Sequence, residues 1–162
     1  MIISTEIEKL VKQVAEQLIE QNYQLATAES CTGGLIGAVC TDLAGSSSWF
    51  QCALVTYSNE AKQTLLGVKS ETLMRYGAVS SQTVREMCAG VLKQRADVAI
   101  AVSGIAGPSG ATGDKPVGTV YIGWQKKGDT AIVAHFNFDG DRSTVRQQAT
   151  EEALKGMLQL LK

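Results

Sequence analysis

Short apolar runs of strand length alternate with amphipathic helical patterns through the first two thirds of the sequence. The strand-like runs lie at residues 23–28, 49–57 and 97–103. The helical patterns, in which apolar residues recur every three or four positions, lie at residues 5–21, 35–43, 70–77 and 80–92. This alternation is typical of a parallel sheet that is covered by helices.

The last third of the sequence has a different pattern. Residues 117–125 and 130–138 alternate apolar and polar side chains around the turn sequence KKGD at 126–129, which predicts an antiparallel hairpin. Residues 141–161 form a final helical pattern. The sequence therefore predicts an α/β fold: a single three-layer α/β/α domain over residues 1–162 with a mixed β-sheet.

The composition of the sequence argues against several classes of protein. The chain has 162 residues, 44% hydrophobic and 19% charged, with a net charge of -1, which favours a soluble protein without a basic nucleic-acid-binding face. Its apolar runs are far shorter than the roughly 20 residues of a membrane span. The N-terminus lacks the features of a signal peptide, so we expect a cytoplasmic protein. Four scattered cysteines and one histidine predict no disulfide framework, metal site or cofactor.

The strongest candidate site follows the first strand, at residues 27–34 (TAESCTGG). Ser30 lies at a strand-to-helix junction, where unpaired backbone N–H groups of a first helical turn stabilise anions and oxyanions. Gly33 and Gly34 would allow a ligand to approach the backbone closely. The alternative is that Ser30 or Thr32 simply caps the helix.

Two further strand ends carry polar or glycine-rich sequences. Tyr57 and Lys62 follow the second strand, where Ser58 or Asn59 can cap the next helix, and a glycine-rich loop begins at Gly104 after the third. The carboxyl ends of parallel strands form the ligand crevice of open α/β sheets, so we expect these segments to meet. The glycine-rich loop lacks a phosphate-binding motif and could be an ordinary turn.

Ser30, Lys62 and Tyr57 together suggest nucleophilic chemistry. A serine nucleophile needs a base, and His135 lies on the wrong face of its strand, which leaves Lys62. A lysine becomes a base only if a closed site lowers its pKa from about 10.4 toward 7–8. The phenol of Tyr57 could relay the proton or hold the amine. The alternatives are an exposed, charged Lys62 and a thiol nucleophile at Cys31.

Arg142 and Arg146 stand one helical turn apart near the start of the last helix. Two guanidinium groups beside a helix N-terminus are suited to binding an anion. Solvated surface charges are the alternative reading of the same pair.

Five motifs, in order along essentially the whole chain, closely resemble the C-terminal domain family of CinA proteins. They lie at residues 27–34, 55–62 (VTYSNEAK), 77–80 (GAVS), 103–108 (SGIAGP) and 115–120 (KPVGTV). The loop at 110–114 (GATGD) departs from the second glycine and acidic residues that are common in the family. Longer members carry another domain in front, and we expect this protein to lack that domain and any activity that belongs to it.

The resemblance implies an amidase acting on nicotinamide mononucleotide to give nicotinate mononucleotide and ammonia, in pyridine-nucleotide salvage. It implies Ser30 as nucleophile, Lys62 as base and Tyr57 as an assisting residue, without metal or cofactor. The expected substrate-binding residues are Cys31, Thr32, Gly33, Gly34, Asn59, Gly104, Ile105, Ala106, Gly107, Arg142 and Arg146. The alternative function is a non-catalytic nucleotide-binding or protein-interaction module, and self-association into a homo-oligomer is left open.

Overall fold

The computed structural model describes residues 3–162, so the first two positions of the predicted domain lie outside the described residues. The elements follow the predicted alternation of helices and strands. In chain order they are α1 (Thr5–Gln21), β1 (Leu25–Glu29), α2 (Leu35–Asp42), a 3₁₀ turn η1 (Ser46–Ser48), β2 (Phe50–Val55), α3 (Asn59–Leu66), α4 (Ser70–Tyr76), α5 (Ser81–Leu92), β3 (Val98–Gly104), β4 (Thr119–Lys126), β5 (Ile132–Asn137) and α6 (Arg142–Leu161).

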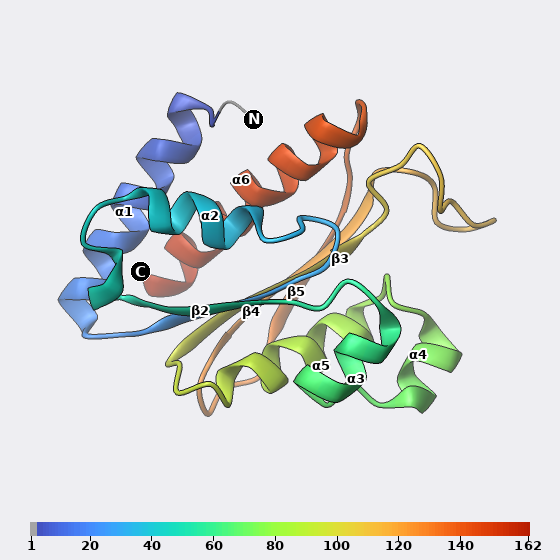
Figure 1. Ribbon diagram of the computed structural model, residues 1–162, viewed down its shortest axis with the longest axis horizontal. Helices are drawn as coiled ribbons and strands as arrows, with labels where there is room; N and C mark the ends of the chain where they lie inside the picture. The colour runs from blue at the N-terminus through green and yellow to red at the C-terminus, as the bar shows by residue number, and fades with distance from the viewer. Residues whose placement is uncertain (1–2) are drawn as a thin grey trace.

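The strands build one mixed sheet, as predicted. Its five strands stand in the order β2-β1-β3-β4-β5 (Figure 1). β1 pairs in parallel with both β2 and β3, whereas β3, β4 and β5 pair antiparallel. The predicted hairpin of β4 and β5 is confirmed, with Asp129 N donating to Lys126 O at 3.0 Å across its turn.

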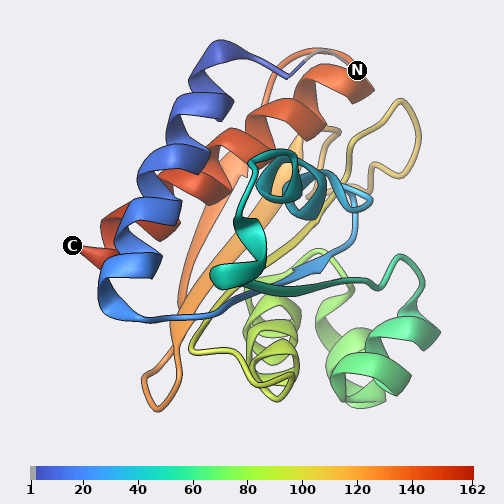
Figure 2. The same cartoon turned by 60° about the vertical axis from the view of Figure 1, so that its left-hand side comes forward.

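Helices cover both faces of the sheet, which confirms the three-layer arrangement. α1, α2 and α6 lie on one face, and α1 and α6 run side by side (Figure 2). α5 lies against β1, β3 and β4 on the other face, with α3 and α4 packed against α5 (Figure 1).

The two faces of the sheet differ in side-chain size. Large side chains such as Leu25, Ile100 and Ile122 pack under α1 and α6. The α5 face carries small residues, among them Ala28 and Ala101, which let α5 approach the backbone. On that face a Cβ added at Gly123 would lie 2.7 Å from a Val84 methyl group, so the fit leaves no room for a larger residue.

Polar caps fix where the helices start beside the carboxyl edge of the parallel strands. Ser58 caps α3 by accepting from Ala61 N at 3.0 Å, so Ser58 and not Asn59 is the capping residue. Asp141 caps α6 by accepting from Thr144 N at 2.9 Å. These caps place Lys62 in the first turn of α3 and Arg142 at the start of α6.

Two features are absent from the described residues. No helix within residues 3–162 is both long and apolar enough to span a membrane. Over the same residues, no three His, Cys, Asp or Glu side chains gather closely enough to hold a metal ion.

Candidate active site

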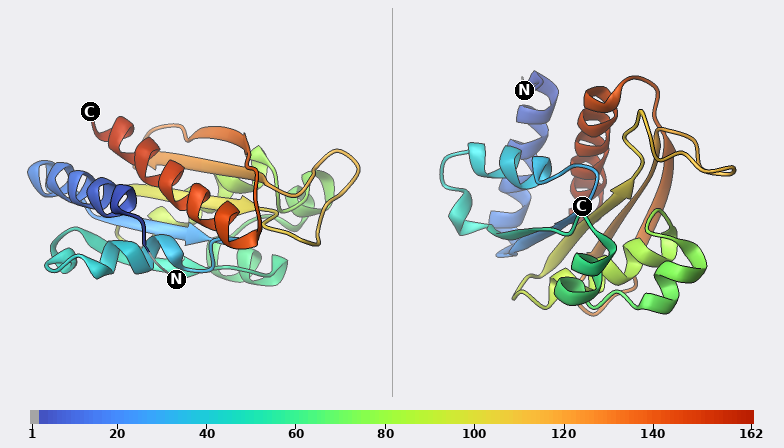
Figure 3. Two further views of the ribbon diagram at one scale, coloured as in Figure 1. Left: turned by 90° about the horizontal axis from the view of Figure 1, so that it is seen from above. Right: turned by 45° about the vertical axis from the view of Figure 1, so that its right-hand side comes forward.

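The carboxyl ends of β1, β2 and β3 bring the predicted site segments together. Backbone pairing continues one residue past the strands, since Ser30 N donates to Val102 O at 3.0 Å and Thr56 N donates to Glu29 O at 2.8 Å. Ser30 is therefore fixed between the ends of β2 and β3. The connection from β3 to β4 leaves this edge and extends away from the body of the domain (Figure 3).

A cavity opens at this edge and holds most of the predicted residues. Its lining comes from the loops after β1, β2 and β3, the segment before α5, and the start of α6. The lining residues are Ser30, Cys31, Tyr57, Lys62, Ala78, Val79, Ser103, Gly104, Ile105, Ala106, Gly107, Ser109, Gly110 and Arg142. Five predicted substrate-binding residues are not in this lining: Thr32, Gly33, Gly34, Asn59 and Arg146.

Ser30 and Lys62 are in direct contact inside the cavity. The Lys62 Nζ lies 3.0 Å from Ser30 Oγ, 2.7 Å from the carbonyl oxygen of Thr56 and 3.2 Å from that of Tyr57. Lys62 is 1% exposed and Ser30 8% exposed. Burial lowers the pKa of Lys62 to about 8, and it outweighs the opposite influence of the nearby Cys31.

Tyr57 touches the lysine through its backbone and not through its phenol. Its carbonyl oxygen accepts from Lys62, while its hydroxyl accepts from the Arg142 guanidinium at 3.0 Å. The side chain is 61% exposed, at the mouth of the cavity. The phenol therefore does not contact the amine as expected, and its partner is the Arg142 guanidinium.

Cys31 adjoins the nucleophile candidate but has the environment of a packed thiol. It is 5% exposed, and burial raises its pKa to about 12. A thiol with that pKa stays protonated at neutral pH, and the thiolate is the reactive form. Its position in the lining is compatible with packing beside the substrate.

We expected the backbone N–H groups at the N-terminus of α2 to be unpaired and to face a ligand, but two of them are paired within the chain. The backbone N–H groups of Ile36 and Gly37 donate to the Glu29 carboxylate, at 3.0 and 2.9 Å. Gly33 N donates to Ser30 O at 2.9 Å. These donors satisfy the chain itself, because Glu29 occupies the place at which an anion would bind.

Arg142 and Arg146 have different partners although they lie one turn apart. Arg142 lines the cavity and donates to Gly107 O at 2.8 Å as well as to Tyr57. Arg146 donates to the carbonyl oxygens of Cys31 and Thr32, at 3.1 and 2.9 Å. Only Arg142 faces the cavity, whereas Arg146 holds the loop behind it.

Our sequence analysis missed several residues of the site. Ala78 and Val79 line the cavity from the segment before α5, and Ser103 lines it from the end of β3. Ser103 could have been found by the rule that identified Ser30, since it ends a buried parallel strand. Glu29 could have been flagged as a carboxylate in an apolar strand, because a buried charge needs hydrogen-bond partners.

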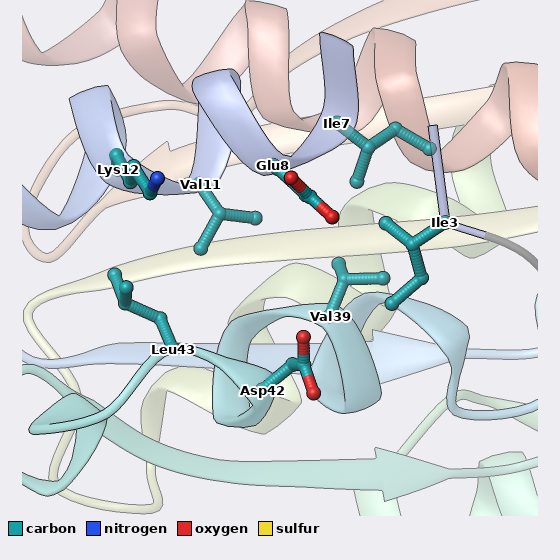
Figure 4. A pocket seen from close by; sticks show the side chains of 8 residues that line it. All are labelled: Ile3, Ile7, Glu8, Val11, Lys12, Val39, Asp42 and Leu43. Carbon is teal, nitrogen blue, oxygen red and sulfur yellow. The ribbon is translucent and has the colours of Figure 1, made fainter. Parts of the chain in front are cut away.

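A second hollow lies between α1 and α2. Its floor is aliphatic, from residues such as Val11 and Val39, and the side chains of Glu8, Lys12 and Asp42 stand around it (Figure 4). It contains no hydroxyl or thiol nucleophile. The chemistry of the molecule is therefore expected in the cavity around Ser30.

The fold and this cavity define an α/β protein with a buried serine–lysine pair at the carboxyl edge of its parallel strands. The chain belongs to the CinA C-terminal domain family, whose model matches residues 7–161. It is 48% identical to the nicotinamide-nucleotide amidohydrolase PncC of Escherichia coli K12, over 96% of this chain and 94% of that protein.

A longer relative and a solved structure extend the comparison. A CinA-like protein of Thermotoga neapolitana is 45% identical over 96% of this chain, which covers 38% of that protein. The crystal structure of the competence/damage inducible protein CihA of Agrobacterium tumefaciens superposes with a TM-score of 0.96 at 37% identity, covering 100% and 99% of the two chains.

Proposed function

We propose that this protein hydrolyses the carboxamide of nicotinamide mononucleotide to nicotinate mononucleotide and ammonia, with Ser30 as nucleophile and Lys62 as base. The observation that carries the proposal is the 3.0 Å contact between the buried Lys62 Nζ and Ser30 Oγ. The choice of substrate is supported by the similarity to the nicotinamide-nucleotide amidohydrolase PncC of Escherichia coli, which is 48% identical over nearly the full length of both chains.

The three oxygen contacts of Lys62 fit both protonation states of its amine, because the charged form can donate to all three oxygens and the neutral form to two of them. A charged ammonium has three donors and no acceptor, whereas a neutral amine has two N–H donors and a lone pair. In the neutral form the two N–H groups would serve the carbonyl oxygens of Thr56 and Tyr57, so the lone pair faces Ser30 Oγ. With its pKa lowered to about 8, the amine can accept the serine proton near neutral pH.

The reaction then follows two acyl-transfer steps. Ser30 Oγ gives its proton to Lys62 and adds to the carboxamide carbon, which the positive pyridinium ring makes electrophilic. Collapse of the tetrahedral intermediate breaks the C–N bond, and protonated Lys62 returns the proton to the departing ammonia. Water then attacks the acyl-enzyme with Lys62 as base, which releases the carboxylate and regenerates Ser30. Backbone N–H groups of Cys31 and Thr32 are the proposed oxyanion donors.

The rest of the cavity supplies the proposed substrate contacts. Arg142 presents a cation at the mouth, where it is held by Gly107 and the Tyr57 hydroxyl. A guanidinium in that position suits the phosphate of a mononucleotide. The loop from Gly104 to Gly107 borders the space between this cation and Ser30. Tyr57 would thus assist by orienting Arg142 with its phenol and Lys62 with its carbonyl. We place the reaction in the cytoplasm, in nucleotide salvage.

The direct test measures ammonia release from nicotinamide mononucleotide. Ser30→Ala should abolish turnover, and mass spectrometry of quenched wild-type protein should find an acyl adduct on the peptide that contains Ser30. Binding of the mononucleotide without ammonia release would instead favour the non-catalytic nucleotide-binding module. Turnover that survives in Ser30→Ala and is lost in Cys31→Ala would overturn the choice of nucleophile.

Comparing substrates tests the phosphate contact. Arg142→Ala should weaken turnover of the mononucleotide by about tenfold or more, because a charged hydrogen bond is worth about 1.5–3 kcal/mol. The riboside, which lacks the phosphate, should lose little. Equal losses on both substrates would remove this role from Arg142.

A further inference from the structure

The loop that carries Ser30 is held by two charged side chains that take no part in the proposed chemistry. On one side is Glu29, which is fully buried. Its Oε1 accepts from the Thr32 hydroxyl at 2.8 Å and from Ile36 N at 3.0 Å. Its Oε2 accepts from the Thr27 hydroxyl at 3.0 Å and from Gly37 N at 2.9 Å. One carboxylate therefore joins the end of β1 to the first turn of α2.

On the other side is Arg146, which reaches the loop from α6. Its Nε donates to Cys31 O at 3.1 Å and its terminal nitrogen donates to Thr32 O at 2.9 Å. The fit is close, since a Cβ added at Gly33 would lie 3.2 Å from the guanidinium. Gly33 and Gly34 both have positive φ, +60° and +97°, so the loop has a backbone conformation that few other residues adopt readily.

The two side chains bind opposite ends of the peptide dipole. The anion takes N–H and O–H donors, and the cation takes carbonyl oxygens. Because a peptide group is planar and trans, holding the oxygen of Cys31 also sets the direction of the Thr32 N–H, which points the opposite way. The Thr32 residue is held at both its hydroxyl and its carbonyl.

We infer that Glu29 and Arg146 form a two-sided clamp that positions Ser30 Oγ and the adjoining backbone N–H groups for reaction. Both are positioning residues, because neither lines the cavity. The inference rests on the proposed function for its effect on turnover. It reassigns Arg146 from the substrate to the loop, and it leaves Arg142 as the cation that faces the ligand.

The variants that test the clamp are Arg146→Met, Thr32→Val and Glu29→Gln. Each should lower kcat for nicotinamide mononucleotide by about 10- to 100-fold, the effect of a small misplacement of reacting groups. KM and the pH midpoint of kcat should stay near those of the wild type, because the cavity lining and Lys62 are untouched. The losses of Arg146→Met and Thr32→Val should be less than additive, since both release the same loop.

A control and a second readout separate the clamp from general stability. Leu154→Ala removes a buried side chain from the same helix without touching the loop, so it should lower the unfolding temperature and leave kcat unchanged. Hydrogen exchange, which needs no turnover, should accelerate at the amides of residues 31–37 in Arg146→Met and not selectively in Leu154→Ala. If Glu29→Gln fails to fold, the other two variants still decide the question.

Two results would overturn the clamp. One is a kcat and an exchange pattern in Arg146→Met that match the wild type. The other is a loss in Arg146→Met confined to KM for the mononucleotide and absent for the riboside, which would make Arg146 a phosphate ligand. Failure of the wild type to release ammonia would count against the proposed function alone, because the exchange experiment would still test the clamp.

Discussion

The two buried ionisable side chains beside Ser30 differ in how completely they are satisfied. Glu29 accepts four hydrogen bonds, two from backbone N–H groups and two from threonine hydroxyls. Lys62 has two carbonyl acceptors and Ser30 Oγ as its neighbours, with no carboxylate hydrogen-bonded to it among residues 3–162. Both side chains are at most 1% exposed.

The difference teaches how one fold separates structure from reactivity. A buried charge that is fully hydrogen-bonded ties elements together, as Glu29 does for β1 and α2. A buried amine without a compensating anion loses its preference for the charged form, so its pKa falls and it becomes a base. The two side chains are thus expected to fail in different ways when they are altered.

Lys62→Met should produce the largest effect. Removing the base should lower kcat by about 10²- to 10⁴-fold, the usual contribution of a positioned general base. The fold should survive, because methionine fills similar space and removes an amine that is costly to bury. Steady-state kinetics with thermal unfolding on the same sample checks both points. Retained activity in Lys62→Met would break the assignment of the base.

Glu29→Ala should, unlike Lys62→Met, strongly lower the stability of the fold. It leaves the N–H groups of Ile36 and Gly37 and the hydroxyls of Thr27 and Thr32 without their acceptor. Each buried unsatisfied group costs about 1–3 kcal/mol, so a loss of at least about 3 kcal/mol in the free energy of unfolding is expected. Urea denaturation measures it. A change below 1 kcal/mol, on the scale of an ordinary surface substitution, would show that the carboxylate is not a structural tie.

The pH dependence tests Lys62 in the intact protein. Only the neutral amine is a base, so kcat/KM, which reports the free enzyme, should rise with pH around a midpoint of about 8 and increase by about tenfold between pH 7 and the plateau. The stability contribution has a definite sign. Between pH 8 and 10.5 the unfolded state binds more protons at this residue than the folded state, so the Lys62 contribution to stability should rise with pH over that window. The buried thiols of Cys31, Cys40 and Cys88, whose pKa is raised by burial, contribute with the opposite sign above about pH 9.

The matched control for the pH experiment is Lys62→Met, in which this contribution to the stability profile should disappear. A kcat/KM profile that is flat from pH 6 to 9 would contradict a titrating lysine base. A profile that falls with increasing pH would indicate that the charged amine is the active form.

Sequence patterns predicted the fold because apolar residues recur at a spacing typical of a helix or of a strand within each element. In addition, the three strand runs end in recognisable polar or glycine-rich segments. The same rule predicted that Ser30 and Lys62 meet, since both follow parallel strands. It could not predict the partner of Arg146 or the direction of the Tyr57 phenol. Both depend on where α6 lies in the fold, through tertiary contacts between residues 115 positions apart for Arg146 and Cys31 and 85 positions apart for Arg142 and Tyr57.

Cys31→Ala should have the smallest effect. The Cys31 thiol is a third buried ionisable group that can be compared with Glu29 and Lys62. The Cys31 thiol lies in the same cavity wall, but burial raises its pKa to about 12, so it stays protonated where Lys62 titrates. We expect kcat within about twofold of the wild type, because a protonated thiol does not attack. The pH midpoint should stay at or slightly below that of the wild type, because only the minor, opposing influence of Cys31 on the pKa of Lys62 is removed.

Alkylation of the folded protein provides an independent measurement of the same point. Iodoacetamide should modify the half-buried Cys52 before the buried Cys31, and turnover should persist while Cys31 is unmodified. Rapid modification of Cys31 that parallels loss of ammonia release would place a reactive thiolate in the cavity. In that case burial would have activated the thiol as well as the amine. That outcome is not expected, because desolvation favours the neutral form of both groups, and the neutral form is the reactive one only for the amine.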